Sequence, residues 1–289
     1  MSIQAVQISS ISSVGTLSAK FERLGSGLRA YLEAGLLIAF SGGVDSAFLV
    51  WAAERERSAS GGRLLALTTS SASLATAERA DVEKFVGQYR FDHLWIDSRE
   101  LEDSDYLRND TSRCYHCKSE LFRICGEVAG ERGLKHVAYG YNASDIGDTR
   151  PGHRAAIENG IVSPLADAGL TKDDIRQLMR INGLDLADKP ASPCLSSRLL
   201  TGVAITSEKL KAVDELESML RDRGLRVFRV RVHESSGSRF VRLEVASEEM
   251  ELAFTLREEL TAAAKKLGFR WVTLDLAGYK TGGGNAAAG

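Results

Sequence analysis

The chain contains 289 residues, of which 44% are apolar and 26% are charged, and its formal net charge is −2. This length and composition predict a globular protein of two domains with a sizeable core. The balanced charge gives no overall attraction to nucleic acid, and the sequence has neither a membrane-length apolar run nor a signal-peptide layout. We therefore expect a cytoplasmic protein that binds neither nucleic acid nor a membrane. Its four cysteines are expected to be reduced thiols, metal ligands or catalytic groups.

The first half of the chain has the pattern of an α/β domain. Residues 1–17 are rich in serine and small residues and are expected to form a flexible tail. A helix is predicted over 19–34, and after it short apolar strands alternate with helices, which is typical of a doubly wound parallel sheet. The strands are predicted at Leu36–Phe40, Arg63–Thr69, His93–Asp97 and His136–Gly140.

The segment with the clearest chemical meaning is the Ser-Gly-Gly-Val-Asp-Ser sequence at residues 41–46, between the first strand and its helix. Backbone N–H groups at a helix start lack partners and the helix dipole favours an anion, while glycines let a ligand approach closely. The lysine of a Walker loop is absent. An ordinary strand-to-helix turn is the alternative, but the pattern resembles the pyrophosphate loop of the N-type ATP pyrophosphatases. That resemblance implies ATP binding, and the aspartate is well placed to hold Mg²⁺. The expected ATP-binding residues are Ser41, Gly42, Gly43, Asp45 and Ser46.

A second polar segment follows the fourth predicted strand. If that strand lies beside the first, Gly140 lines the same crevice as the phosphate loop, because ligands bind where the strand order switches. The loop beyond it contains Asn142, Asp145, Asp148 and Arg150. Such residues are common turn formers, but beside a phosphate loop they could hold a metal or a ribose. We favour this role for the last three and less for Asn142.

The remaining sequence predicts a small α+β domain with an antiparallel strand pair, beyond a boundary near 201–206. Its elements are predicted as a helix at Ser207–Arg221, strands at Arg226–Val232 and Phe240–Val245, a helix at Glu248–Leu267 and a strand at Trp271–Leu276. We therefore expect a flexible tail at 1–17, an ATP-binding domain at 18–203, a substrate-binding and oligomerisation domain at 204–280 and a second flexible tail at 281–289.

Two cysteines, Cys114 and Cys117, lie one turn apart on a predicted helix and share one face. A lone C-x-x-C pair is compatible with zinc, an iron–sulfur cluster, redox chemistry or no function. Cys125 would lie about 12 Å farther along the helix, at ~1.5 Å per residue, and is expected in the core. Cys194 is then the remaining candidate for a third ligand, and three thiolates suit a [4Fe–4S] cluster with one open iron.

Cys194 also has the surroundings expected of a reactive thiol. Ser192 could cap a helix with Pro193 at its first position, which would place the thiol in the first turn. The positive helix end and Arg198 would both favour the thiolate. A buried, inert cysteine is the alternative, but the hydroxyl-rich neighbours are unlike a core and favour a reactive group.

Beyond these patterns, the chain resembles the LarE family of ATP-dependent sacrificial sulfur transferases, within the superfamily of N-type ATP pyrophosphatases. The resemblance covers nearly everything after residue 30. The segments that carry it are 41–46, 113–118, 140–152, 188–198 and 271–279. The run Asp-Lys-Pro-Ala-Ser-Pro-Cys-Leu-Ser-Ser-Arg at 188–198 is the most specific of them.

The resemblance implies synthesis of the nickel-pincer nucleotide cofactor of lactate racemase. ATP and Mg²⁺ would adenylate a carboxylate of pyridinium-3,5-biscarboxylic acid mononucleotide, and the Cys194 thiolate would then displace AMP. Carbon–sulfur cleavage would leave a thiocarboxylate and a dehydroalanine. Other family members resemble this chain in three cysteines, matching Cys114, Cys117 and Cys194, which hold a [4Fe–4S] cluster. The cysteine set favours that version.

The resemblance also implies roles in the second domain. Arg229 and Arg231 alternate by two on a predicted strand and match phosphate-binding positions of the family, although a solvated strand face is the alternative. Glu217 and Glu244 match acidic positions near the family's site, and Arg198 would support Cys194. The resemblance further implies a homo-oligomer, for example a hexamer.

Two other functions remain open from the sequence. An enzyme that thiolates transfer RNA would also pair a phosphate loop with cysteines, although no basic, aromatic-rich stretch supports it. A metal-binding or sulfur-carrying protein without turnover would use the cysteines only structurally and would not cleave ATP.

Overall fold

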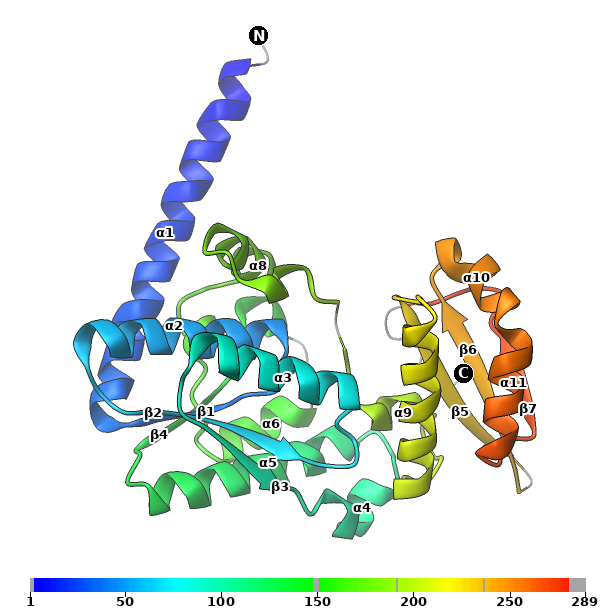
Figure 1. Cartoon of the computed structure of the whole chain (residues 1–289). Coiled ribbons are helices and arrows are strands. Elements are labelled where there is room, and N and C mark those ends of the chain that lie inside the picture. Colours follow the sequence, from blue (N-terminus) through cyan, green and yellow to red (C-terminus); the bar gives the residue numbers. More distant parts are fainter. Residues whose placement is uncertain (1–2, 148–150, 191, 236, 281–289) are drawn as a thin grey trace. The chain divides into compact units, whose positions relative to one another are not determined.

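The computed structural model describes residues 3–147, 151–190, 192–235 and 237–280, with side chains from residue 16 onward. The chain divides into two compact units (Figure 1). The first comprises Met1–Thr69, Asp81–Asp97 and Lys118–Ala191, and the second comprises Ser70–Ala80, Ser98–Cys117 and Ser192–Gly289. The second unit therefore draws on three stretches of the chain. The expected functional domains at 18–203 and 204–280 stay a prediction.

The first unit is built on a parallel sheet with the strand order β3-β2-β1-β4. β1 pairs in parallel with β2 on one side and with β4 on the other, so that Leu36 lies opposite both Leu64 and His136. The predicted doubly wound α/β fold is thereby confirmed, and β4 lies beside β1, which meets the condition set for Gly140 to line the crevice of the phosphate loop. The strands are β1 (Leu36–Ala39), β2 (Leu64–Ser70), β3 (His93–Asp97) and β4 (His136–Tyr139).

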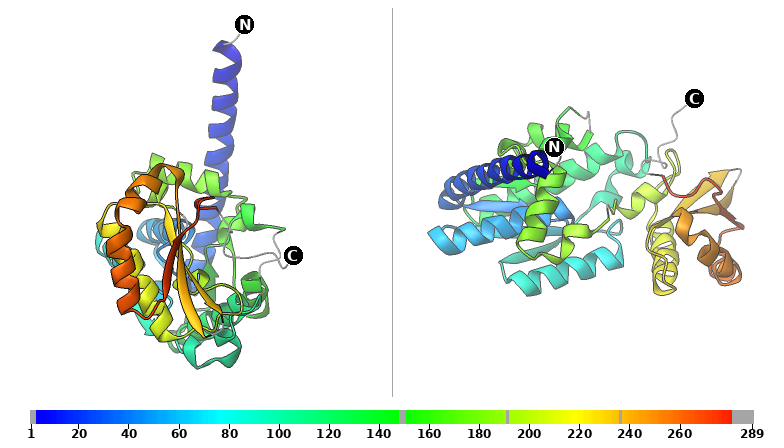
Figure 2. Two further views of the ribbon diagram at one scale, coloured as in Figure 1. Left: turned by 90° about the vertical axis from the view of Figure 1, so that its right-hand side faces the viewer. Right: turned by 90° about the horizontal axis from the view of Figure 1, so that it is seen from above.

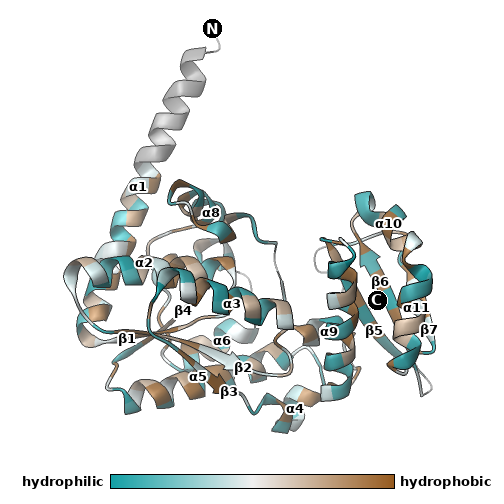
Figure 3. Ribbon diagram, viewed as in Figure 1, coloured by the Kyte–Doolittle hydropathy of each residue, from teal (hydrophilic) through white to brown (hydrophobic). Residues whose placement is uncertain are grey.

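Helices cover both faces of this sheet because alternate residues of β1 point to opposite sides. Leu36 and Ile38 pack with α1, α2, α3 and α8, whereas Leu37 and Ala39 pack with α5. β1 is buried on both faces and is drawn brown in Figure 3. The helices are α1 (Ile3–Ala34), α2 (Val44–Ser60), α3 (Thr76–Tyr89), α5 (Arg113–Glu131), α6 (Pro151–Glu158), α7 (Pro164–Asp167) and α8 (Lys172–Ile181).

The expected flexible tail at 1–17 overlaps the first helix. α1 begins at Ile3 and continues to Ala34 without interruption, so the described part of the expected flexible tail is helical. The serines in this segment disfavour a helix only weakly, and no proline interrupts it. The second predicted tail, 281–289, lies outside the described residues.

The second unit contains a three-stranded sheet with the order β5-β6-β7 (Figure 2). β5 and β6 are antiparallel, as predicted, and β7 joins β6 in parallel. Alternate apolar residues such as Val230 and Leu243 pack under α9 and α11 on one face. The predicted helix at 248–267 is divided into α10 and α11. The elements are α4 (Ser104–Leu107), α9 (Ser207–Asp222), β5 (Phe228–Ser235), β6 (Ser238–Val245), α10 (Met250–Thr255), α11 (Arg257–Lys266) and β7 (Trp271–Leu274).

Among the helices that the structure describes, none combines the length and the apolar character needed to cross a membrane.

Candidate functional site

The predicted phosphate loop lies between β1 and α2 and is braced by its own hydrogen bonds. The hydroxyl oxygens of Ser41 and Ser46 lie 3.1 Å apart, and Ser46 Oγ also donates to the Gly43 carbonyl at 3.1 Å. The Ser41 N–H donates to Ser46 Oγ at 3.2 Å. Gly43 precedes α2 without a side-chain cap, so an anion could satisfy the first N–H groups of this helix.

Two glycines shape this loop. Gly42 has a φ of +71°, a left-handed conformation that glycine adopts without strain. A Cβ added to Gly140 would lie only 2.7 Å from the backbone nitrogen of Ser46. The residue after β4 thus lies against the first turn of α2, which is the neighbourhood that the strand order implied.

Asp45 projects from the first turn of α2 and is half-buried. Its Oδ1 atom is buried and has no hydrogen-bond partner in the part of the chain that the structure describes. Burial raises the pKa of Asp45, Lys172 lowers it and Asp145 raises it, while Arg176 and a hydrogen bond from Asn142 lower it further. Mg²⁺ prefers carboxylate oxygens, so the unpartnered Oδ1 atom fits a magnesium ligand.

The polar loop after β4 is folded around Asn142, which is 1% exposed. Its side chain accepts a hydrogen bond from the Ser144 N–H at 2.9 Å, and Asp145 Oδ2 accepts one from the Asn142 N–H at 3.3 Å. The sequence favours a site role for Asp145 over Asn142, yet the side chain of Asn142 forms a hydrogen bond with Asp45. Asp148 and Arg150 lie outside the described residues.

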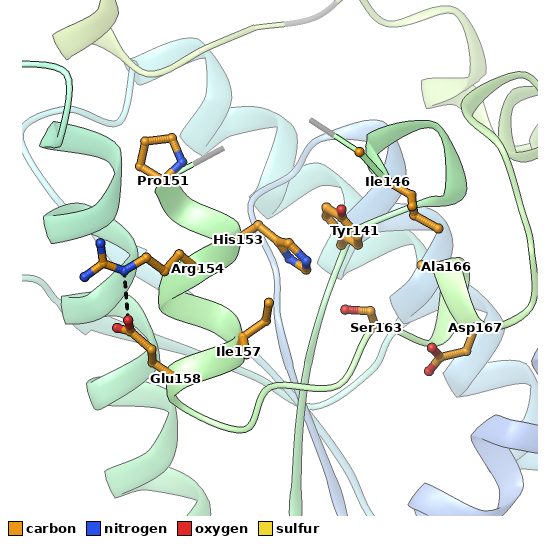
Figure 4. Close-up of a pocket in the computed structure, with 11 residues that line it drawn as sticks. Tyr141, Ile146, Pro151, His153, Arg154, Ile157, Glu158, Ser163, Ala166 and Asp167 are labelled. Carbon is orange, nitrogen blue, oxygen red and sulfur yellow. Dashed lines mark hydrogen bonds and ion pairs between the residues drawn. The ribbon is translucent and has the colours of Figure 1, made fainter. Parts of the chain in front are cut away.

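A pocket of about 810 Å³ opens beside this loop within the first unit (Figure 4). The rings of Tyr141 and His153 stack in its wall, with centroids 4.0 Å apart. Tyr139 pairs with His153 Nδ1 at 2.6 Å, and burial raises the pKa of Tyr139 to about 12. The described lining residues do not include the phosphate loop, so this pocket does not contain the loop itself.

In the second unit, Cys194 is exposed and immediately precedes the short 3₁₀ helix η4 (Leu195–Arg198). Its φ and ψ of −57° and 158° are those of a cap position, so the prediction that Ser192 caps a helix with Cys194 in its first turn was wrong. Loss of hydration among many surrounding atoms raises the pKa of the Cys194 thiol, Arg113 lowers it, and Cys114 raises it. The net direction is upward, opposite to the expected preference for thiolate.

Arg113 connects the two cysteine segments. Its guanidinium donates to the Ser196 carbonyl at 3.0 Å and lies 3.8 Å from Cys114 Sγ. It also donates to Asn109 Oδ1 at 2.7 Å, and Asn109 in turn donates to the Leu200 carbonyl at 2.9 Å. One buried asparagine and one arginine therefore fix the segment that follows the cysteine.

A buried polar network centred on Glu100, which is 4% exposed, contacts the segment that follows Cys194. Ser73 Oγ donates to Glu100 Oε1 at 2.5 Å, and the Tyr106 hydroxyl donates to the same atom at 3.2 Å. Tyr106 also bonds Ser196 Oγ at 2.6 Å. Burial raises the pKa of Tyr106, so it stays protonated and can donate to Glu100.

Two buried ion pairs hold the backbone around Cys194. Arg198 is bidentate to Glu217, at 2.9 and 3.0 Å, and its Nη1 donates to the Pro193 carbonyl at 2.5 Å. Arg231 is 5% exposed; it donates to Glu244 at 3.0 Å and to the Ser197 carbonyl at 2.9 Å. Charged groups buried this deeply need full pairing, and here the pairing also fixes the cysteine segment.

Arg229 lies on the same face of β5 as Arg231 but is only half-buried. Its guanidinium carbon lies 5.0 Å from the ring centre of Tyr279. Burial lowers the pKa of Arg229, and the nearby Arg198 lowers it further. Tyr279 and Glu217 act in the opposite direction and raise the pKa of Arg229.

Within the part of the chain that the structure describes, the cysteine thiols do not converge closely enough to hold a single ion. Among the described residues, the group whose ligand atoms all lie within 4.8 Å consists of Asp103, Asp105 and His116. Cys114, Cys117 and Cys194 lie in the same unit but do not converge to that extent. A multi-iron cluster binds its thiolates through different irons and does not require such convergence, so two accessible thiols and one half-buried thiol remain compatible with it.

The amino-acid sequence was compared with those of known proteins. No family model matches the chain. The chain is 38% identical over 248 residues to an uncharacterized protein of Synechocystis sp., covering 85% of this chain and 90% of that protein. It is 28% identical over 246 residues to the pyridinium-3,5-bisthiocarboxylic acid mononucleotide synthase of Lactiplantibacillus plantarum, covering 85% and 87%. The chain belongs to the LarE family.

A further relative of this LarE-family chain is an uncharacterized protein of Methanocaldococcus jannaschii, 31% identical over 177 residues, or 61% of this chain and 67% of that protein.

Several residues of the site were missed from the sequence. Around the phosphate loop these are Lys172, Arg176 and Lys189, and around Cys194 they are Ser73, Glu100, Tyr106, Asn109, Arg113 and Ser196. Most of them stand far from their partners in the sequence, so no local pattern indicated them. Three of them could have been found, because Arg113 belongs to the 113–118 segment, and Lys189 and Ser196 to the 188–198 run, that carry the LarE resemblance.

Proposed function

We propose that this protein is a sulfur transferase that uses ATP to convert the carboxylates of pyridinium-3,5-biscarboxylic acid mononucleotide into thiocarboxylates. The family and the name of the L. plantarum relative support this reaction. The observation that carries the proposal is the contrast between two thiols. Cys125 is fully buried, as a structural cysteine should be, whereas Cys194 is exposed on a backbone that two buried arginines fix.

The first step of the proposed reaction is adenylation. A carboxylate oxygen of the substrate attacks the α-phosphorus of ATP, the bond from that phosphorus to the bridging oxygen breaks, and pyrophosphate leaves with the electron pair. The phosphate loop would bind the leaving pyrophosphate through the first N–H groups of α2. Mg²⁺, which Asp45 would hold, supplies charge neutralisation of the phosphates.

The second step transfers sulfur. The Cys194 thiolate attacks the acyl carbon, the carbon–oxygen bond breaks, and AMP leaves. A base then removes the Cα proton of Cys194 while its Cβ–S bond breaks, which releases the thiocarboxylate and leaves dehydroalanine. Arg113 would favour the thiolate, because its charge lowers the pKa of Cys194 against the effect of lost hydration.

The alternative source of sulfur is a [4Fe–4S] cluster on Cys114, Cys117 and Cys194, which would supply a bound sulfide and permit repeated turnover. In that case Arg113 would offset the negative charge of the thiolates, and Arg198 and Arg231 would fix the segment that carries Cys194. This is the version that the three cysteines favour.

We assign the substrate's nucleotide phosphate to Arg229. It is the more accessible of the two predicted arginines, and a guanidinium can bind a phosphate through two parallel charge-assisted hydrogen bonds. Arg231, which already pairs with Glu244 and Ser197, would act mainly by holding the Cys194 segment.

The test uses protein purified without oxygen and assayed for iron and sulfide. It is incubated with ATP, Mg²⁺ and the pyridinium substrate, and pyrophosphate, AMP and thiocarboxylate are measured together with the mass of the protein. Loss of the mass of H₂S from Cys194 after one turnover selects the sacrificial route, while bound iron and multiple turnovers with added sulfide select the cluster. Absence of both AMP and thiocarboxylate would contradict the proposal.

A further inference from the structure

Lys189 is held beside the phosphate loop by a rigid backbone. The preceding 3₁₀ helix η3 (Asp185–Asp188) is anchored in the core of the first unit by Ala187, which is 4% exposed. Arg176 of α8 donates to the carbonyl of Ala187 and, at 2.8 Å, to that of Lys189 itself. The position of the Lys189 backbone is therefore fixed from two sides.

The side chain of Lys189 reaches the loop directly. Its Nζ donates to the Gly42 carbonyl at 3.1 Å and lies 2.7 Å from Asp81 Oδ2, and the side chain is only 11% exposed. An ammonium with this little exposure is screened weakly by solvent and acts strongly on nearby charges. The loop sequence itself contains no basic residue.

The contact with Gly42 determines where a neighbouring N–H group points. The C=O and N–H of one peptide plane point in opposite directions, so a carbonyl held by Lys189 fixes the Gly43 N–H on the other side. That N–H donates a hydrogen bond to Ser41 Oγ at 3.4 Å, on the side where the Ser41 and Ser46 hydroxyls meet. Because Gly42 and Gly43 are flexible, an external anchor is needed to keep this orientation.

We propose that Lys189 is a positioning residue of the phosphate site and provides the positive charge that a Walker loop obtains from its own lysine. It holds the Gly42–Gly43 peptide with its N–H on the Ser41 hydroxyl, which keeps the shape of the loop, and its charge favours the pyrophosphate part of ATP. This inference rests on the proposed use of ATP and adds to it a residue for the leaving group. The adenosine part of ATP does not depend on Lys189.

The test compares binding of inorganic pyrophosphate and of AMP, each with Mg²⁺, by calorimetry on the full chain. Lys189→Met should raise the dissociation constant for pyrophosphate at least tenfold, roughly the effect of losing one charge-assisted hydrogen bond, and should change that for AMP by less than about twofold. Lys189→Arg keeps the charge and should restore most of the pyrophosphate affinity. Lys84→Met is the matched control, since Lys84 is an exposed α3 lysine that pairs with Asp185 of η3 at 3.4 Å.

A second variant, Asp81→Asn, tests whether the charge of Lys189 acts on pyrophosphate without changing Lys189 itself. Asp81→Asn removes the acidic partner of Lys189 but leaves the contact with Gly42, so pyrophosphate should bind equally well or more tightly. The inference is overturned if Lys189→Met binds pyrophosphate like the wild type, if it weakens pyrophosphate and AMP equally, or if Asp81→Asn loses pyrophosphate tenfold. If Lys189→Met fails to fold, the pyrophosphate affinities of Lys189→Arg and Asp81→Asn test the inference in its place. Both should stay within tenfold of the wild type, and a larger loss in either overturns the inference. A wild type that binds neither ATP nor pyrophosphate would contradict the proposed function instead.

Discussion

The phosphate loop and the Cys194 segment are built on different principles. The loop is stabilised mostly by neighbours in the sequence: Ser41 and Ser46 bond each other and the backbone between them. The Cys194 segment is held by side chains from distant positions, among them Arg113 and Arg231. Substitutions in the loop should therefore affect mainly the use of ATP. Substitutions around Cys194 should lower both the folding stability and the rate of sulfur transfer.

The largest effect is expected at Asp45. Asp45→Asn removes the proposed magnesium ligand and should lower the rate of pyrophosphate release by about 10³-fold, or about 4 kcal/mol, with little change in folding. Pyrophosphate release and thermal unfolding are measured on the same preparation. The control is Asp97→Asn, at an exposed acid that ends β3. Equal rates for Asp45→Asn and the control would show that Asp45 does not act on the phosphates.

The next largest effect is expected at the buried pair beside Cys194. Arg198→Met leaves Glu217 as an unpaired buried charge and should lower the free energy of unfolding by about 3 kcal/mol, measured by urea titration. The double variant Arg198→Met/Glu217→Leu should regain most of that stability but not sulfur transfer, because the Pro193 carbonyl stays unanchored. A stable double variant with full transfer would show that Arg198 acts only on stability.

A smaller effect concerns acid stability of the first unit. Thr68 donates to the Phe40 carbonyl at 2.6 Å and so must accept from His93 Nε2 at 2.8 Å, while burial lowers the pKa of His93 to about 4. Between pH 6.5 and 4 the unfolded chain binds a proton that the folded chain does not, so stability is lost as the pH falls through this window. The expected loss is on the order of 2 kcal/mol after allowance for partial exposure.

Unfolding titrations at several pH values test this effect. His93→Gln should remove most of the loss between pH 6.5 and 4, since glutamine has no proton to take up. If the variant keeps the wild-type slope, another group causes the acid sensitivity.

The smallest effect concerns the reactivity of the Cys125 thiol compared with that of the other three cysteines. Burial raises the pKa of Cys125 to about 12, so iodoacetamide at pH 8 should label Cys114, Cys117 and Cys194 in iron-free protein but not Cys125. Cys125→Ala should lower the free energy of unfolding by about 1 kcal/mol and leave sulfur transfer unchanged. Labelling of Cys125 at the rate of Cys194 would contradict this distinction.

The contrast between the two regions also explains what could be predicted from the sequence. The parallel α/β sheet could be predicted from local patterns, namely short apolar runs alternating with helices, and the position of β4 beside β1 entered only as a condition. The conformation at Cys194 could not be obtained in that way. Local preference predicted a helix start there, but bonds from Arg198 and Arg231 to the Pro193 and Ser197 carbonyls fix a different backbone.

The most direct test of the account compares the wild type with Cys194→Ser, without oxygen, measuring pyrophosphate and thiocarboxylate from the same reaction. We expect the wild type to form both products. The variant should still release pyrophosphate, because the loop is intact, but should form no detectable thiocarboxylate. Thiocarboxylate from Cys194→Ser in wild-type amounts would contradict the claim that sulfur reaches the activated carboxyl group through this position.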